Sequence, residues 1–167
     1  MRSNKCDLGV AACVVHEERI LLVQEAKGPH QGLWGVPKGF VDEGETPFSA
    51  TLRELKEECG IEGEIESIIG MRECVRNGQT AVFIVYLVKP LSIDVLVDEN
   101  EIMNFGWFSF DEIRLIDWLS PTMQSIVLNA FSSSERMQIH DVSNQRETPY
   151  LVHLFTNQNE ILLEAMK

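Results

Sequence analysis

Short apolar runs alternate with polar turns at the start of the chain. Residues 8–15 (LGVAACVV) and 20–25 (ILLVQE) are rich in aliphatic side chains, and the polar residues HEER separate them. Apolar, β-branched runs bounded by turn residues predict two β-strands. Residues 27–45 are rich in glycine yet apolar in their middle, which predicts an ordered loop that carries function.

A helix is predicted from Thr46 to Cys59. Thr46 is a favourable N-cap, Pro47 suits the first helical position, and Gly60 is typical of the residue that ends a helix. At 100° per residue, one face of this helix is apolar and is expected to pack on the core. That face consists of Phe48, Leu52, Leu55 and Cys59.

Further elements follow this helix. Residues 64–73 and 79–88 are strand candidates, and Asn77-Gly78 between them is a strong hairpin signal. Later segments predict a strand at 104–108, a short helix at 111–118, and a helix that runs from Pro121 to about Phe131. This order of strands and helices indicates an α/β or α+β fold with a mixed sheet.

The chain is expected to divide near residue 131. Residues 1–131 have the length of one ordinary domain. Residues 132–167 form a C-terminal extension, which begins with a polar linker. Apolar residues return in YLVHLF and EILLEAM, which predict an added strand and helix that dock on the domain or on a partner subunit.

The charge balance excludes some classes of partner. Twenty-six acidic residues against fourteen basic ones give a net charge of −12. Broad nucleic-acid or anionic membrane binding needs a basic surface, so neither a membrane nor a long nucleic acid is an expected partner. An anionic substrate would need a divalent cation to reverse the local field.

The cysteines and the N-terminal segment indicate a reducing, cytoplasmic location. The four cysteines show no C-x-x-C spacing, so a zinc site is not expected, and Cys13 and Cys59 are predicted to be buried thiols. The apolar run at the N-terminus is short for a membrane span and lacks a typical signal-peptide cleavage site.

Three carboxylates cluster on the helix opposite its apolar face. With Glu54 as zero, Glu57 falls at about −60° and Glu58 at about +40°. Like charges at these spacings repel by roughly 0.2–0.5 kcal/mol per pair on an isolated helix. The helix alone leaves two interpretations open, a solvated acidic face or a site that binds a cation.

The loop and helix together resemble a known family signature. Residues 39–61, GFVDEGETPFSATLRELKEECGI, are similar to the Nudix box, G-x5-E-x7-R-E-U-x-E-E-x-G-U, where U is a bulky aliphatic residue. Residues 32–39 and 99–113 also resemble flanking segments of that family, so the likeness covers roughly 8–120. All nine specified positions of the box match: Gly39, Glu45, Arg53, Glu54, Leu55, Glu57, Glu58, Gly60 and Ile61.

This resemblance implies a fold, a cofactor and a ligand set. The fold would be the Nudix fold, a mixed β-sheet sandwiched between helices. The cofactor would be Mg²⁺ (or Mn²⁺), which prefers oxygen ligands. Glu57 and Glu58 would be the principal metal ligands, with Glu54 and the carbonyl of Gly39 completing the set.

The resemblance also implies catalytic and substrate-binding roles. Arg53 either contacts phosphate or, as the family pattern favours, orients a box carboxylate. A general base is needed, and Glu101 is the candidate, with Glu99 or Glu54 as alternatives. Lys38, which replaces a common glycine, is expected to bind substrate phosphate beside Gly39.

The implied activity is hydrolysis of a diphosphate linkage in a nucleoside diphosphate derivative by metal-activated water. ADP-ribose or NADH, dinucleoside polyphosphates and (oxidised) nucleoside triphosphates all remain open as substrates. The alternative class is a non-catalytic Nudix module that binds or senses a nucleotide. Prenyl diphosphate isomerisation would need a cysteine within 27–45, where none occurs. Family members are often dimers, so a homodimer is one expected assembly.

Overall fold

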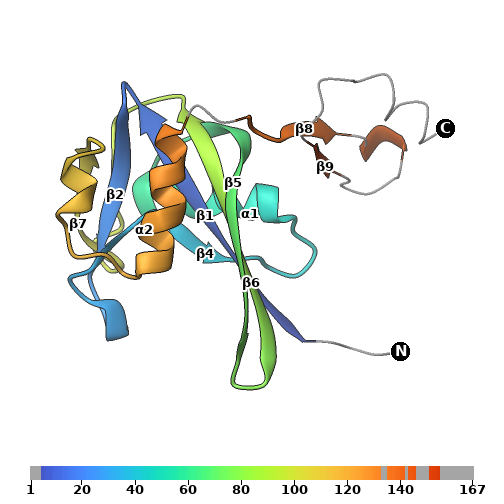
Figure 1. The fold of residues 1–167 in the computed structure, drawn as a ribbon, viewed down its shortest axis with the longest axis horizontal. Helices are drawn as coiled ribbons and strands as arrows, with labels where there is room; N and C mark the ends of the chain where they lie inside the picture. Colours follow the sequence, from blue (N-terminus) through green and yellow to red (C-terminus); the bar gives the residue numbers. More distant parts are fainter. Residues whose placement is uncertain (1–4, 133–134, 142, 146–150, 155–167) are drawn as a thin grey trace.

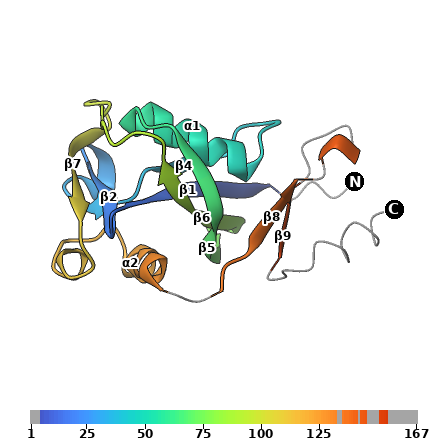
Figure 2. The same cartoon turned by 90° about the horizontal axis from the view of Figure 1, so that it is seen from above.

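A mixed sheet between two helices forms the body of the protein. The computed structural model describes residues 5–132, 135–141, 143–145 and 151–154. Figure 2 shows helix α1 (Pro47–Cys59) on one face of the sheet and helix α2 (Pro121–Leu128) on the other. The expected sandwich of a mixed sheet between helices is therefore confirmed.

Seven strands make up this sheet, and Figure 1 labels most of them. They are β1 (Cys6–His16), β2 (Arg19–Glu25), β3 (Trp34–Gly35), β4 (Lys38–Phe40), β5 (Gly63–Arg76), β6 (Gln79–Pro90) and β7 (Ile102–Phe108). A second, two-stranded sheet consists of β8 (Gln138–Asp141) and β9 (Leu151–Leu154). The part of the chain that the structure describes also has four 3-10 helices: η1 (Gly28–His30), η2 (Glu112–Arg114), η3 (Asn129–Phe131) and η4 (Ser143–Gln145).

Strand β1 organises the large sheet. It runs parallel to β6 over nearly its whole length, and β5 continues the sheet beyond β6. On its other side β1 pairs with β4 at residues 9–11 and with β2 at residues 15–16. Strands β2 and β4 therefore pair with the same edge of β1, at different positions along it.

The core lies on both faces of β1 because its side chains alternate between the two helices. Val10 and Val14 pack with Leu55 of α1, whereas Ala11 and Cys13 pack with Val127 of α2. All six side chains are fully buried. This two-sided burial explains the nearly continuous apolar run of β1.

The predicted limits of α1 match the structure. Thr46 and Ser49 form a reciprocal capping box, in which the Ser49 backbone N–H donates to Thr46 Oγ1 at 3.1 Å. Gly60 ends the helix with a positive φ of 68°, a conformation that glycine adopts without a steric penalty. The apolar face packs as predicted at three of its four positions, since Leu55 and Cys59 are fully buried and Leu52 packs against the core. Phe48 is only partly buried.

The hairpin predicted at Asn77-Gly78 is also present. Both residues have positive φ, 52° and 78°, and the turn joins β5 to β6. The strands extend beyond the predicted limits, and Figure 1 shows the hairpin projecting past the rest of the sheet. The strands predicted at 8–15, 20–25 and 104–108 correspond to β1, β2 and β7.

The helix predicted at 111–118 is wrong. Only the short 3-10 helix η2 forms there, and the chain then pairs with β3 through a bridge between Trp34 and Trp118. The Trp34 N–H donates to the carbonyl of Asp117 at 2.8 Å, and Trp118 Nε1 donates to the carbonyl of Ile113 at 2.6 Å. These tertiary hydrogen bonds occupy carbonyl groups that a helix would use internally.

The C-terminal extension contributes a hairpin. The strand predicted within YLVHLF is present as β9, and β8 pairs with it inside the segment expected to be a polar linker. Arg136 donates to the carbonyl groups of Ala130 and Ser132, and the His153 ring lies 6.0 Å from that of Tyr86. The helix predicted in EILLEAM lies outside the described residues.

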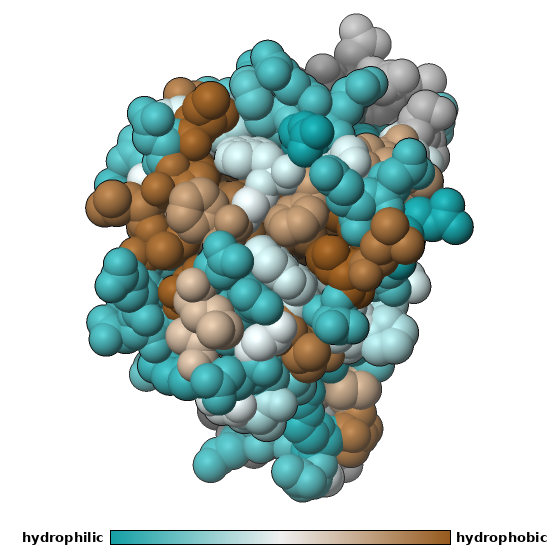
Figure 3. All heavy atoms as spheres, turned by 90° about the vertical axis from the view of Figure 1, so that its left-hand side faces the viewer, coloured by the Kyte–Doolittle hydropathy of each residue, from teal (hydrophilic) through white to brown (hydrophobic). Residues whose placement is uncertain are grey.

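Apolar and hydrophilic side chains are interspersed on the side of the molecule that bears β7 (Figure 3). Among the described strands, β7 pairs only with β2, and it exposes Met103 and Phe105. Across the described ranges, no helix has the length and apolar character that crossing a membrane would require. All four cysteines are free thiols, and Cys13 and Cys59 are buried as predicted.

The packing of α1 gives a first prediction. Leu55→Ala should lower the free energy of unfolding by about 2–5 kcal/mol, because it leaves a cavity under the helix. Leu115→Ala is the control, since Leu115 is 86% exposed, and it should change stability by less than about 0.5 kcal/mol. Chemical denaturation measures both, and equal effects would contradict this view of the core.

Candidate active site

A single large hollow brings most of the predicted site residues together. Its volume is about 760 Å³, within the range of roughly 300–1,000 Å³ that is usual for ligand sites. It extends from α1 and β4 across the ends of β1, β6 and β5 to the start of α2. Of the predicted residues, Lys38, Gly39, Glu54, Glu58 and Glu101 line it.

Gly39 and Glu54 are in direct contact. A Cβ atom added to Gly39 would lie 2.0 Å from Cδ of Glu54, so a side chain at this position would displace the Glu54 carboxylate. The glycine therefore lets the helix carboxylate approach the backbone of β4. Only 16% of the Glu54 side chain is exposed.

Glu58 is a buried acid at the floor of the hollow. The residue is 6% exposed, and its Oε2 accepts a hydrogen bond from the Lys38 backbone N–H at 3.0 Å. Burial raises the pKa of Glu58 to about 8; the nearby Lys38 charge opposes this rise, whereas Glu25 and Glu54 add to it. Negative charge is thus crowded here beyond what Lys38 neutralises.

Arg53 joins the loop to the helix with one guanidinium group. Its Nε and Nη2 donate to the two carboxylate oxygens of Glu45 at 3.1 and 2.9 Å. Its Nη1 donates to Glu54 at 2.8 Å and to Glu57 at 3.0 Å, and Nη2 also donates to the Phe40 carbonyl at 2.9 Å. Hydrogen bonds from Arg53 lower the pKa of Glu45.

Glu57 lies apart from the other two helix carboxylates. Its side chain is 61% exposed, and it is not among the residues that line the hollow. In the described structure Arg53 binds it. The helical angles place Glu58 nearer the apolar face than Glu57, and in the structure Glu58 is buried whereas Glu57 is exposed.

Glu25 is a site residue that the sequence analysis missed. It ends β2 and lines the hollow, and its carboxylate forms an ion pair with the Lys38 ammonium group. Both side chains are about one-fifth exposed, at 19% and 20%. The sequence signal that could have identified Glu25 is a charged residue at the end of an otherwise apolar strand. His30 of η1, to which no role was assigned, also lines the hollow.

Glu101 reaches the hollow from the loop before β7. Its carbonyl accepts a hydrogen bond from the Ala26 N–H at 2.8 Å, which ties this loop to the end of β2. Its Oε1 lies 3.3 Å from Nζ of Lys27, and its side chain is half exposed. Glu99, the alternative candidate base, is exposed and does not line the hollow.

The donor set fits a hard divalent cation. Glu54 and Glu58 offer carboxylate oxygens beside Gly39, and burial raises the pKa of Glu58, so a nearby cation would favour its charged form. Within the described ranges, no three acidic, imidazole or thiol groups already converge on one point. Arg53 holds Glu57 and Lys38 holds Glu25, so a cation would have to compete with these two side chains.

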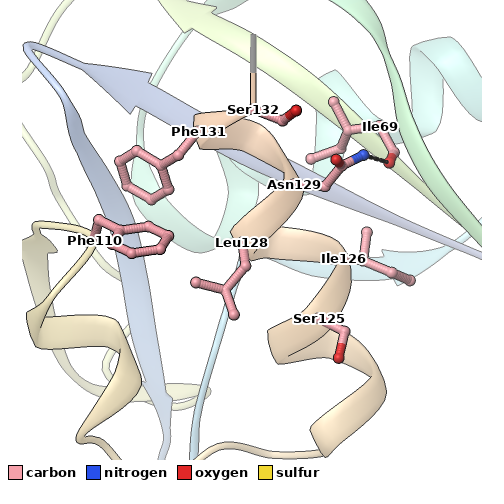
Figure 4. A pocket seen from close by; sticks show the side chains of 8 residues that line it. All are labelled: Ile69, Phe110, Ser125, Ile126, Leu128, Asn129, Phe131 and Ser132. Atoms are coloured by element: carbon pink, nitrogen blue, oxygen red, sulfur yellow. Dashed lines mark hydrogen bonds between the residues drawn. The ribbon is translucent and has the colours of Figure 1, made fainter. Parts of the chain in front are cut away.

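A second hollow, of about 580 Å³, is apolar and lies between α2, η3 and β5. Figure 4 shows the Phe110 and Phe131 rings beside each other at its rim, with a centroid distance of 5.4 Å. The Asn129 amide, which also lines it, donates to the Ile69 carbonyl at 2.9 Å. The residues that line this hollow include no carboxylate or cationic side chain, so the chemistry belongs to the first one.

Comparisons with known proteins agree with this geometry. The model of a family described as NUDIX domain matches residues 7–129. Nudix hydrolase 2 of Arabidopsis thaliana is 36% identical over 110 residues, which cover 63% of this chain and 40% of that protein. The 8-oxo-dGDP phosphatase NUDT18 of Homo sapiens is 36% identical over 90 residues, which cover 54% of this chain and 27% of that protein.

A solved structure gives a fuller overlap. The MutT NUDIX hydrolase from Burkholderia pseudomallei superposes with a TM-score of 0.65 at 30% identity. That match covers 74% of this chain and 97% of the bacterial one. The two curated relatives are much longer than the part that this chain matches, whereas the bacterial protein has nearly the same extent.

The buried acid gives a second prediction, about stability without metal. In a buffer that contains a metal chelator, the melting temperature of the wild type should fall relative to that of Glu58→Gln as pH rises from about 5 to 8. Because burial raises the folded-state pKa of Glu58 to about 8, the unfolded chain releases this proton at lower pH than the folded one. Stability is therefore lost as pH rises through this window.

The loss of stability is measurable as a shift in melting temperature. Each kcal/mol lost should lower the melting temperature by about 2–4 °C in a chain of this length. Glu66→Gln is the matched control, because Glu66 is exposed on β5 and should follow the wild-type curve. Parallel curves of melting temperature against pH for the wild type and Glu58→Gln would show that Glu58 is not a buried acid.

Proposed function

Since the chain belongs to the NUDIX domain family, we propose that it is a hydrolase that cleaves a diphosphate linkage in a nucleoside diphosphate derivative, using Mg²⁺ or Mn²⁺. The observation that carries this proposal is the contact of Glu54 with Gly39 beside the buried Glu58, at the floor of a hollow of about 760 Å³. A hollow of this volume accommodates a nucleotide.

Four groups would hold the cation: the carboxylates of Glu54, Glu57 and Glu58 and the carbonyl of Gly39. When bound, the cation supplies a counter-charge for the diphosphate and lowers the pKa of an attacking water. Arg53 would give up Glu57 to the cation while it keeps both oxygens of Glu45. Because two hydrogen bonds to Glu45 hold Arg53 in place, Arg53 would continue to orient Glu54.

Glu101 would act as the general base. It reaches the same hollow from the opposite side, and the Ala26–Glu101 hydrogen bond fixes its backbone. Its carboxylate would accept a proton from the attacking water. Lys27, 3.3 Å away, would then offset the charge changes on this loop.

Lys38 would bind the substrate phosphate. In the described structure its ammonium group pairs with Glu25 inside the hollow, so it is already desolvated and held in position. An incoming phosphate would share this cation with Glu25 or replace it. Lys38 therefore supplies a positive charge in a chain whose net charge is −12.

The alternative, a non-catalytic module that binds nucleotides, is less well supported. Every carboxylate of the family signature is present, and the described structure brings Glu54, Glu58 and Glu101 to one hollow. A binding module would not need a general base opposite a metal site.

The third prediction tests the activity itself. A screen of ADP-ribose, NADH, dinucleoside polyphosphates and oxidised nucleoside triphosphates with Mg²⁺ or Mn²⁺ should yield phosphate-bond cleavage by the wild type. Glu58→Gln should abolish this cleavage, because it removes a charged metal ligand. Glu66→Gln should retain the wild-type rate, and a fully active Glu58→Gln variant would make the metal assignment wrong.

The fourth prediction concerns the base. Glu101→Gln should slow turnover by roughly 10²–10⁴-fold at unchanged metal affinity, because general-base catalysis contributes that much. The neighbouring Glu99→Gln, which lies outside the hollow, is the matched control and should leave the rate unchanged. If Glu101→Gln also retained full activity, the role would move to Glu54.

A further inference from the structure

The end of the hollow away from the helix carboxylates is a shelf on the α2 face of the sheet. Four residues lie in register across four strands here: Phe40 of β4, Gly9 of β1, Phe83 of β6 and Arg72 of β5. Residues paired across neighbouring strands point to the same face of a sheet. All four line the hollow that also contains Glu54 and Glu58.

An aromatic ring lies flat on this shelf because its neighbour is a glycine. A Cβ atom added to Gly9 would lie 2.6 Å from Cδ2 and 3.1 Å from Cε2 of Phe83, so the ring leans over the bare backbone of β1. On the other side of Gly9, Phe40 is 64% exposed. The shelf thus has an aromatic floor with a second aromatic side chain at its edge.

Arg72 brings unsatisfied hydrogen-bond donors to the shelf. Its Cζ atom lies 5.6 Å from the centroid of the Phe83 ring, and its Nε is buried without a hydrogen-bond partner among the described residues. A buried donor without a partner costs roughly 1–3 kcal/mol, so a ligand acceptor at this position would be favourable. No salt bridge is found for Arg72 within the described ranges, in a chain rich in carboxylates.

Asp7 brings an acceptor to the same shelf. It precedes Gly9 by two residues on β1 and lines the hollow. The Gln79 amide donates to Asp7 Oδ1 at 2.5 Å, which orients the carboxylate. No other hydrogen bond to this carboxylate is found within the described ranges, and an ionised carboxylate accepts several. The shelf therefore combines an aromatic floor, a guanidinium donor and a carboxylate acceptor.

We propose that this shelf seats the nucleobase of the substrate and that it selects a guanine-type base. This inference rests on the proposed hydrolase function and deepens it. The base stacks on Phe83, Arg72 donates to the adjacent O6 and N7 acceptors, and Asp7 accepts from N1–H and the 2-amino group. Arginine pairs with this acceptor edge of guanine in a bidentate manner. A carboxylate, which only accepts hydrogen bonds, matches the donor edge.

Other bases satisfy fewer of these groups. Adenine offers N7 as an acceptor but has a donor where guanine has O6, so one Arg72 donor would face another donor. Pyrimidines cover less of the ring of Phe83. Guanine is the base that satisfies both polar side chains at once.

Binding of non-hydrolysable nucleotides tests this proposal without turnover. Calorimetry with Mg²⁺ and the α,β-methylene analogues of GDP, ADP and UDP should show tightest binding of the guanine compound to the wild type. Arg72→Gln should weaken binding of that compound by about 5- to 150-fold, and leave binding of base-free methylene diphosphonate unchanged. Arg72→Lys, which keeps the charge, should show the same selective loss.

The chain offers a matched control. Arg114 also lies over an aromatic ring, 5.8 Å from the centroid of Phe110, but it does not line the hollow. Arg114→Gln should therefore bind every analogue as the wild type does. Asp7→Asn should reduce the preference for guanine over hypoxanthine, which lacks the 2-amino group.

The outcomes separate this inference from the proposed function. Equal weakening of the guanine analogue and the diphosphonate by Arg72→Gln would make Arg72 a phosphate ligand and overturn the base seat. Unchanged guanine binding, or a preference for adenine or uracil, would also overturn it. The protein could also prefer guanine in a manner that depends on Arg72 and yet hydrolyse no nucleotide. That result would support the nucleobase site and refute the proposed hydrolase function.

Discussion

The rest of the site depends on the burial of one carboxylate, Glu58, against the backbone of β4. A buried acid is costly unless it is paired and hydrogen-bonded. Here the Lys38 N–H supplies a hydrogen bond and the Lys38 side chain supplies a nearby charge, yet the pKa of Glu58 stays raised to about 8. A bound cation beside Glu58, as the proposed function requires, would stabilise the charged form of this carboxylate.

Rigid supports on both sides keep this acid in place. Leu55 and Cys59, on the opposite face of α1, anchor the helix in the core, so Glu58 cannot rotate away into solvent. Arg53 then ties the helix to the preceding loop through Glu45 and to β4 through the Phe40 carbonyl. One guanidinium group thus connects three segments, which lysine could not do with a single point charge.

Local rules were sufficient for the helix and the hairpin but not for the site around them. Thr46, Pro47 and Gly60 define α1 through interactions within a few residues, so the sequence predicts its limits correctly. The helix expected at 111–118 fails because Trp34, distant in sequence, takes the backbone of Asp117 into a bridge. Tertiary pairing overrides local propensity there.

The difference between local patterns and tertiary contacts also explains why the sequence predicts the helix carboxylates but not Glu25. Glu54, Glu57 and Glu58 share a helix face by simple periodicity, and a motif identifies them. Glu25 joins them only because β2 ends beside β4, which no local pattern shows. Periodicity also separates Glu57 from Glu58, because Glu58 lies nearer the apolar face of the helix, and the structure buries Glu58 and leaves Glu57 exposed.

The extent of α2 determines which part of one sheet face is covered as core and which part lines the hollow. Along β1, Cys13 and Ala11 are fully buried under α2, whereas Gly9 and Asp7 point to the same face and line the hollow. The helix begins only at Pro121, so it leaves this end of the face uncovered. A single alternating strand therefore supplies core residues at one end and the floor of a ligand site at the other. Because both ends belong to one strand that is paired with β6, a ligand at this end would bind to a backbone that the sheet already holds in place, which would lower the cost of reorganisation.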